Sequence, residues 1–576
     1  MCGIAGKIVF GDEQPVGRQE IQKMNDKLQH RGPDGEGIYV SPKGNIGLGH
    51  RRLAVIDLSP AGQQPMSNED ETVWLVFNGE IYNFQSLRSE LEKKGHKFKS
   101  KTDSEVIIHL WEDCGERCLA FLRGMFAFAI WDEKQQKLFL ARDRVGQKPL
   151  KYYLDEQCLI FASELKAILE ILPRRPAPDL ETVAQFLRFN HVPAPRTGFT
   201  KIAKLPAAHY ALWHKGRLVV KRYWQLDFKR KTEFSYQESK GEILRLLRES
   251  VKMQLVSDVP LGVFLSGGID SSTVVVLASE FQPKLKTFTI GFGERDFDER
   301  PLARLVSQKF GTDHTELEVK PDAIDALPKL IYHYEEPYAD SSALPTFYLS
   351  QLARDQVIVA LNGDGGDEAF GGYRRYLYWR WLHRFRKNFY RQIASYRYFD
   401  RRFDYLFTSD FLEIFDRSVS EENLQNLDDV FNLSFNTFLP DDLLVKVDIA
   451  SMVFGLEARS PFLDHQLLEF SASLPPSWKV GWSGGKKIIR DIAGQFLPPE
   501  VMKGKRGFEL PVDDWFRNDL FEWARDLLLG GKIKGSYFRV DGLERLLMEH
   551  RGGYRNHGQR LWMLTCLESW QRQFLK

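Results

Sequence analysis

The 576-residue sequence has few cysteines, no long apolar run and almost no net charge. Five cysteines do not suggest the disulfide framework of a small secreted protein. No run of about 18 apolar residues could cross a membrane, and the N-terminus lacks the charged-then-apolar pattern of a signal peptide. We therefore expect a cytoplasmic protein with no membrane association.

The formal charge of +2 gives no support for a nucleic-acid partner. Residues 379–402 do interleave Arg and Lys with aromatic side chains, which is typical of a nucleic-acid surface or of an amphipathic helix. The near-neutral chain favours the helix, so we expect small-molecule partners and no nucleic acid. The sequence shows no internal repeat and no low-complexity tract.

The length exceeds that of one hydrophobic core and fits two domains. Residues 1–208 contain many short apolar or alternating segments and a few helical patterns, which predicts layered α/β sheets of mainly antiparallel strands. Proline and glycine then interrupt the chain, and residues 209–235 are predicted to be a linker with a short hairpin. From 236 to 576, strands alternate with helices and predict a doubly wound parallel sheet, mainly helical beyond Tyr373. The predicted strands of this sheet are 261–265, 287–292, 315–319 and 356–361.

Cys2 follows the initiator Met1 and precedes Gly3. If Met1 is removed, Cys2 carries a thiol and a free α-amine, which titrates near pH ~8 and can act as a base at neutral pH. This is the arrangement of an N-terminal nucleophile. Asn78-Gly79 could supply an exposed backbone donor at a tight turn, or could be a plain hairpin turn.

Ser266-Gly267-Gly268-Ile269-Asp270-Ser271-Ser272 follows an apolar strand and opens a helix. Backbone N–H groups at this position bind phosphate oxygens, and Asp270 could hold Mg²⁺ against pyrophosphate. A second loop, Asn362 to Glu368, has three glycines and three acids after another apolar strand. If both loops meet, Asp270 and Asp367 could bind one metal and Asp364 could face a substrate. Lys486 is the candidate cation for charge neutralisation, although it could also be a surface lysine.

These residues together resemble the glutamine-dependent asparagine synthetases along essentially the whole chain. The motifs that carry the resemblance, each modest alone and specific in this order, are MCGIAG at 1–6, HRGPD at 30–34, HRRL at 50–53, FNGEIYN at 77–83, TDSE at 102–105, RDR at 142–144, SELK at 163–166, SGGIDSS at 266–272, GDGGDEAFGGY at 363–373 and LEARSPFLD at 456–464. The resemblance implies a four-layer α-β-β-α N-terminal-nucleophile hydrolase fold for the class II glutamine amidotransferase domain. It implies an ATP-pyrophosphatase synthetase domain with a helical extension for the remainder.

The resemblance also implies site residues. Cys2 would attack glutamine, with Asn78 and the Gly79 N–H as the oxyanion hole. The implied glutamine-binding residues are Arg52, Leu53, Ala54, Val55, Ile56, Asn78, Gly79, Glu80 and Asp103, with Arg52 on the carboxylate and the two acids on the ammonium. The implied ATP-binding residues are Leu265, Ser266, Gly267, Gly268, Asp270, Ser271, Ile290, Asn362 and Gly363. Asp270 and Asp367 would bind Mg²⁺, and Lys486 would steady the departing phosphates.

The implied reaction makes an acyl-adenylate from aspartate and ATP, and ammonia from glutamine then crosses inside the protein and displaces AMP. Two features differ from many members of the family. Asp364 stands where a glutamate is common, and the segment Asp340 to Thr346 has no arginine to bind aspartate. An amidotransferase acting on another carboxylate, such as a sugar acid or a peptide side chain, is therefore the alternative. A homodimer is a family expectation.

Overall fold

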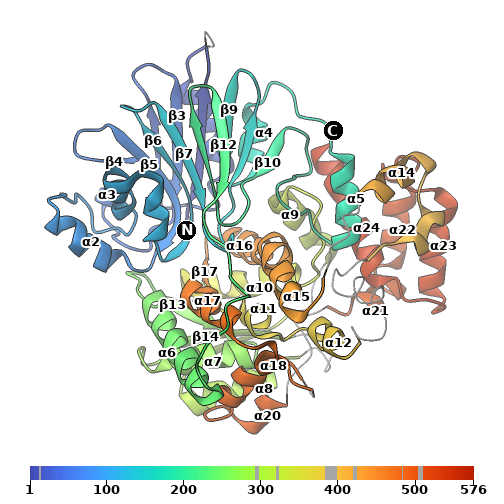
Figure 1. Cartoon of the computed structure of the whole chain (residues 1–576). Helices are drawn as coiled ribbons and strands as arrows, with labels where there is room; N and C mark the ends of the chain where they lie inside the picture. The colour runs from blue at the N-terminus through green and yellow to red at the C-terminus, as the bar shows by residue number, and fades with distance from the viewer. Residues whose placement is uncertain are drawn as a thin grey trace.

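The computed structural model describes residues 1–11, 14–291, 298–319, 323–382, 398–418, 424–482, 484–503 and 510–575. Two antiparallel sheets lie in the N-terminal half, and a parallel sheet among helices lies in the C-terminal half (Figure 1). Within these ranges, no helix combines the length and the apolar character needed to span a bilayer.

The first sheet places the N-terminal strand in its interior. Its strand order over the described residues is β10-β8-β9-β1-β3-β2, and β1 pairs antiparallel with both β3 and β9. The bounds are β1 Gly3–Val9, β2 Gly35–Val40, β3 Ile46–Arg52, β8 Lys151–Leu154, β9 Cys158–Ala162 and β10 Ile202–Lys204. Cys2 therefore directly precedes a strand that is hydrogen bonded on both sides.

The second sheet has the order β12-β11-β7-β6-β5-β4 in the described chain. Its strands are β4 Met66–Ser67, β5 Val73–Ile81, β6 Gly124–Asp132, β7 Lys137–Arg142, β11 His209–His214 and β12 Arg217–Arg222. The hairpin of β11 and β12 pairs with β7, so the first part of the predicted linker, residues 209–222, extends this sheet. Such pairing covers an otherwise open edge of β7. The position of the domain boundary stays a prediction.

Period-two alternation sorts the strand side chains into separate layers. Ile4 and Ile8 of β1 pack between the sheets against Val76 and Leu138. Ala5 faces the opposite side and packs with α1 and α4, whereas Phe77 packs with α2 and α3. The helices are α1 Arg18–Lys27, α2 Phe84–Lys93, α3 Glu105–Cys114, α4 Leu165–Ile171 and α5 Leu180–Phe189. The four-layer α-β-β-α fold is confirmed.

The C-terminal sheet is parallel throughout its described strands, in the order β15-β14-β13-β16-β17. Val263 of β13 packs with the helices on one face, and Phe264 packs with those on the other. The strands are β13 Leu261–Phe264, β14 Lys286–Gly291, β15 Asp313–Glu318, β16 Val359–Leu361 and β17 Glu457–Arg459. Coverage of both faces confirms the doubly wound arrangement.

Helices make up most of the remaining C-terminal half. The crossover helices and those beside the sheet are α6 Tyr236–Gln254, α7 Ile269–Ser279, α8 Arg300–Phe310, α9 Ala323–Tyr334, α10 Ala343–Arg354, α11 Gly366–Phe370 and α16 Leu444–Met452. The helical extension includes α12 Arg374–Leu382, α14 Ser409–Arg417, α15 Leu427–Asn436, α17 His465–Ser473, α18 Pro476–Lys479, α19 Lys487–Ala493, α20 Pro499–Met502, α21 Val512–Arg517, α22 Phe521–Leu529, α23 Val540–Arg551 and α24 Gly558–Phe574. Residues 383–397, the centre of the predicted amphipathic helix, lie outside the described residues.

Candidate active sites in the two halves

Cys2 is buried at the boundary between the two halves, with 7 % of its surface exposed. Its backbone N–H donates to Asn78 Oδ1 at 2.8 Å, and its Sγ lies 4.0 Å from the carbonyl oxygen of Leu53. Burial raises the pKa of the Cys2 thiol, and the positive chain terminus opposes that rise. A base beside the sulfur is therefore needed to form the thiolate at neutral pH.

Asn78 and Gly79 lie inside strand β5, opposite Ala127 and Phe126 of β6. The tight turn expected at this pair, like the alternative hairpin, is wrong, because β5 continues through both residues to Ile81. The Asn78 Oδ1 contact with Cys2 orients the amide, and its buried Nδ2 has no hydrogen-bond partner among the described residues. The amide thus has an uncommitted N–H₂ donor close to Cys2.

Arg52 is the last residue of β3, and its side chain hydrogen bonds to the loop that follows. Its guanidinium donates to the carbonyl oxygens of Ser59 at 2.9 Å and Ile56 at 3.4 Å, and also to that of Asp57. Guanidinium has five N–H donors, so these contacts do not use its full capacity. The loop residues 53–56, all predicted to bind glutamine, begin beside the Cys2 sulfur.

Glu80 and Asp103 form a buried acidic pair near Cys2. Burial, Asp103 and Glu457 raise the pKa of Glu80, and burial together with Glu457 raises the pKa of Asp103 to about 6. Asp103 also accepts the Ile81 N–H at 2.7 Å. Two carboxylates whose charges repel each other in a buried site would be stabilised by an ammonium placed between them.

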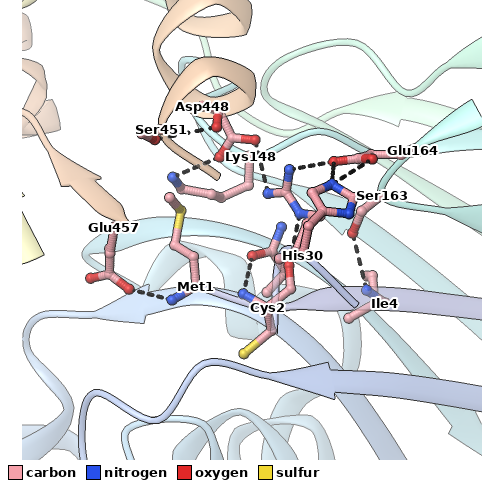
Figure 2. Close-up of polar contacts among 12 residues, drawn as sticks. Met1, Cys2, Ile4, His30, Lys148, Ser163, Glu164, Asp448, Ser451 and Glu457 are labelled. Atoms are coloured by element: carbon pink, nitrogen blue, oxygen red, sulfur yellow. Dashed lines mark hydrogen bonds and ion pairs between the residues drawn. The ribbon is translucent and has the colours of Figure 1, made fainter. Parts of the chain in front are cut away.

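A buried ion network connects the Cys2 region to the C-terminal half (Figure 2). Arg31 donates from Nε to the Cys2 carbonyl oxygen at 3.1 Å and from Nη1 to Glu164 at 2.9 Å. Its Nη2 donates to Asp448 of α16 at 2.8 Å, and Lys148 contacts the other oxygen of that carboxylate at 3.1 Å. The guanidinium therefore links the Cys2 backbone to helix α16 of the C-terminal half.

Met1 itself reaches the C-terminal half (Figure 2). Its ammonium lies 2.5 Å from the Glu457 carboxylate on β17, and Glu457 also accepts from Arg459 Nε at 2.7 Å. Arg459 Nη2 lies 3.5 Å from Glu80. Glu457 keeps Arg459 as a partner if Met1 is removed.

The two predicted phosphate loops meet at the carboxyl edge of the parallel sheet. Gly267, with a φ of +67°, and Gly268 carry the chain from β13 into α7, and Ser266 Oγ contacts Ser271 Oγ at 2.9 Å. A Cβ at Gly363 would lie 2.7 Å from the Ser271 nitrogen, so glycine permits contact between the loops. Leu265, Asp270, Ile290 and Asn362 lie at the same edge, since the adjacent strands β14, β13 and β16 run parallel.

Lys486 joins this edge from the N-terminus of α19. Its ammonium contacts the Asp270 carboxylate, and it lies 2.6 Å from the Asp367 carboxylate. A Cβ at Gly366 would lie 2.6 Å from the Asp270 carboxyl carbon, so the glycine gives the Asp270 carboxylate room. The predicted trio of Asp270, Asp367 and Lys486 is brought together.

Asp364 lies beside this trio, facing Lys446 of α16. Burial raises the pKa of Asp364, the Lys446 charge opposes that rise, and Asp367 and Asp340 add to it. Asp364 is therefore close to both the trio and the segment that follows Tyr338.

Sequence reasoning missed several buried ions at these sites: Lys148, Lys446, Asp448, Glu457 and Arg459, and a role for Arg31. Arg31 and the two β17 residues stood in motifs that had been recognised, but no partner was evident. Lys446 and Asp448 are charged residues within an otherwise largely apolar segment, Leu444–Met452, and that contrast was the available signal.

Two family models match the chain. "Asparagine synthase" matches residues 242–572, and "Glutamine amidotransferase domain" matches residues 1–224. The second match includes the β11–β12 hairpin, in agreement with its pairing to β7.

Curated relatives match over most of the chain. "Asparagine synthetase [glutamine-hydrolyzing] 1" of Bacillus subtilis is 32 % identical and covers 99 % of this chain and 96 % of the relative. "Putative asparagine synthetase [glutamine-hydrolyzing] 2" of Methanocaldococcus jannaschii is 40 % identical, and the match covers 66 % of this chain and 76 % of the relative. "Asparagine synthetase B [glutamine-hydrolyzing]" of Escherichia coli is 29 % identical, and the match covers 87 % of this chain and 80 % of the relative. The chain therefore belongs to the asparagine synthase family, with an N-terminal glutamine amidotransferase domain.

Proposed function

We propose that this chain is a glutamine-hydrolysing asparagine synthetase, which converts L-aspartate, L-glutamine, ATP and water into L-asparagine, L-glutamate, AMP and pyrophosphate. One observation carries the proposal: a buried N-terminal cysteine next to the uncommitted Asn78 amide shares the chain with a sheet edge where Lys486 contacts Asp270 and Asp367. The names of the relatives support the same reaction and do not favour amidation of another carboxylate.

In the glutaminase half, removal of Met1 exposes the Cys2 amine, which takes the thiol proton as sulfur attacks the glutamine amide. Asn78 Nδ2 and the Gly79 N–H stabilise the oxyanion, and the proton passes to the departing ammonia. Water then hydrolyses the thioester to glutamate. Arg52 binds the glutamine carboxylate, and Glu80 with Asp103 binds its ammonium. The buried acidic pair supports this role, because burial and neighbouring carboxylates raise both pKa values, and an ammonium placed beside the pair would stabilise the charged carboxylates.

In the synthetase half, ATP lies along the two phosphate loops, with its contacts at Leu265, Ser266, Gly267, Gly268, Asp270, Ser271, Ile290, Asn362 and Gly363. A carboxylate oxygen of aspartate attacks the α-phosphorus, and pyrophosphate leaves next to Lys486. Ammonia then displaces AMP from the acyl-adenylate. Asp270 and Asp367 are oxygen ligands that suit Mg²⁺, which would shield phosphate charge when bound.

Ammonia passes between the sites inside the protein, since in water at neutral pH it is mostly ammonium and is not a nucleophile. The buried contact of Glu80 with Arg459, at 3.5 Å, supports this route, because it joins strand β5 to β17 of the C-terminal half. A cytoplasmic location and a homodimer are further parts of the proposal.

The test is AMP formation with glutamine and Mg·ATP, measured with and without aspartate. AMP and asparagine should appear in equal amounts only when aspartate is present. AMP formation that does not respond to aspartate would rule out this acceptor.

A further inference from the structure

Lys446 is a buried lysine on helix α16. It faces Asp340 and Asp364, which we call the acceptor region. Only 8 % of the residue is exposed. Its Nζ lies 3.0 Å from Ser342 Oγ and 3.5 Å from the Asp340 carboxylate. Its charge also acts on Asp364, which lies in the loop after β16. Lys446 therefore lies between the phosphate loops and the start of α10.

The acids around Lys446 keep it charged. Burial alone would lower its pKa, but Asp340, Asp364, Asp442 and Glu368 raise it above its ordinary value. The region is thus rich in carboxylates and has this ammonium within it. An amino-dicarboxylic acid has complementary groups, because its ammonium suits the acids and its non-reacting carboxylate needs a cation.

The lysine is not fully engaged by its neighbours. An ammonium has three N–H donors. Among the described residues, Lys446 Nζ donates one hydrogen bond of ordinary length, to Ser342 Oγ at 3.0 Å. The Asp340 carboxylate, at 3.5 Å, is farther than a charge-assisted hydrogen bond of about 2.7–2.9 Å. Asp340 Oδ1 instead accepts the Ser342 N–H at 2.9 Å and its hydroxyl at 2.7 Å. Lys446 thus has donors for a further carboxylate.

The segment Asp340 to Thr346 contains no arginine or lysine of its own, so the cation that faces it comes from α16. We propose that Lys446 binds the non-reacting carboxylate of the acceptor, while Asp340 and Asp364 bind its ammonium. Lys446 is then the residue that selects an amino-dicarboxylic acid over an acid with one carboxylate. This inference rests on the proposed function.

The experiment compares aspartate with β-alanine, which keeps the reacting carboxylate and the ammonium but lacks the other carboxylate. The full-length wild type, Lys446→Met and Lys446→Arg are assayed for the KM of aspartate in AMP formation. For β-alanine, the KM is measured if it is a substrate, and the inhibition constant against aspartate is measured if it is a competitive inhibitor. Glutamate release from glutamine and thermal unfolding report whether each preparation is folded.

In Lys446→Met the KM for aspartate should rise about 10- to 100-fold, the usual range for a hydrogen bond to a charged group, while the β-alanine constant stays within about threefold. Lys446→Arg, which keeps the charge, should shift the aspartate KM less. Equal losses for both ligands would overturn the inference and make Lys446 purely structural. If Lys446→Met does not fold, Lys446→Gln takes its place in the same comparison. A wild type without aspartate-dependent AMP formation would instead refute the proposed function.

Discussion

Asp448 offers a sharp test of how the two halves are coupled. Its carboxylate lies 2.8 Å from Arg31 and 3.1 Å from Lys148, and none of the three side chains is more than 3 % exposed. Asp448→Asn keeps the shape but removes the carboxylate that Lys148 and Arg31 share, and it leaves Arg31 with Glu164 as its carboxylate partner. Breaking a buried ion pair in this way costs about 3–5 kcal/mol. Because Arg31 also donates to the Cys2 carbonyl oxygen, the substitution should also disturb the position of Cys2.

Two measurements follow from that geometry. Denaturant unfolding should show a loss of about 3–5 kcal/mol in the free energy of unfolding. In the coupled reaction, the ratio of asparagine formed to glutamate released should fall below that of the wild type, because the link between Cys2 and α16 is weakened.

The matched control is Asp541→Asn, which removes a carboxylate from an exposed surface pair with Arg539 at 2.6 Å. Exposed pairs contribute little, so neither stability nor the product ratio should change measurably. If Asp448→Asn resembles this control in both measurements, the buried network does not couple the halves.

Three further predictions concern the two sites and the core. Cys2→Ala should abolish glutamine-driven asparagine synthesis and retain synthesis from added ammonia; loss of both would show that the sites are not separable, and intact mass of the active wild type should lack Met1. Lys486→Met should lower AMP formation about 10²–10³-fold by removing a charge beside Asp270 and Asp367, while glutamate release continues; an unchanged rate would exclude Lys486 from the chemistry. Lys479 is wholly buried, and burial lowers its pKa from 10.5 to about 7. The buried charge therefore costs up to about 5 kcal/mol below pH 7, and the cost declines between pH 7 and 10.5 as the folded state deprotonates first. Lys479→Met should raise the free energy of unfolding most near pH 6, and an advantage that grows with pH would contradict this.

Local patterns in the sequence were sufficient for much of the fold. The strand predicted at 261–265 and the helix predicted to follow the SGGIDSS loop rest on apolar runs and glycine positions, which act over a few residues; the structure has them at Leu261–Phe264 and Ile269–Ser279. The phosphate loops were found for the same reason, since a glycine-rich segment between strand and helix needs no distant partner to be recognised. Because parallel strands present their carboxyl ends at one edge, Asp270 and Asp367 could be expected to meet.

Tertiary structure decided the rest. Asn78-Gly79 has the local character of a turn, yet pairing with Ala127 and Phe126 of β6 holds it in a strand. Arg31 and Asp448 are 417 positions apart, and the Met1 ammonium and Glu457 are 456 apart. No periodicity relates such pairs, and a charged residue in an apolar segment indicates only that some counter-charge must exist. Which counter-charge it meets depends on how the two halves pack, because burial makes close pairing of these ions necessary and the packing alone selects the partners.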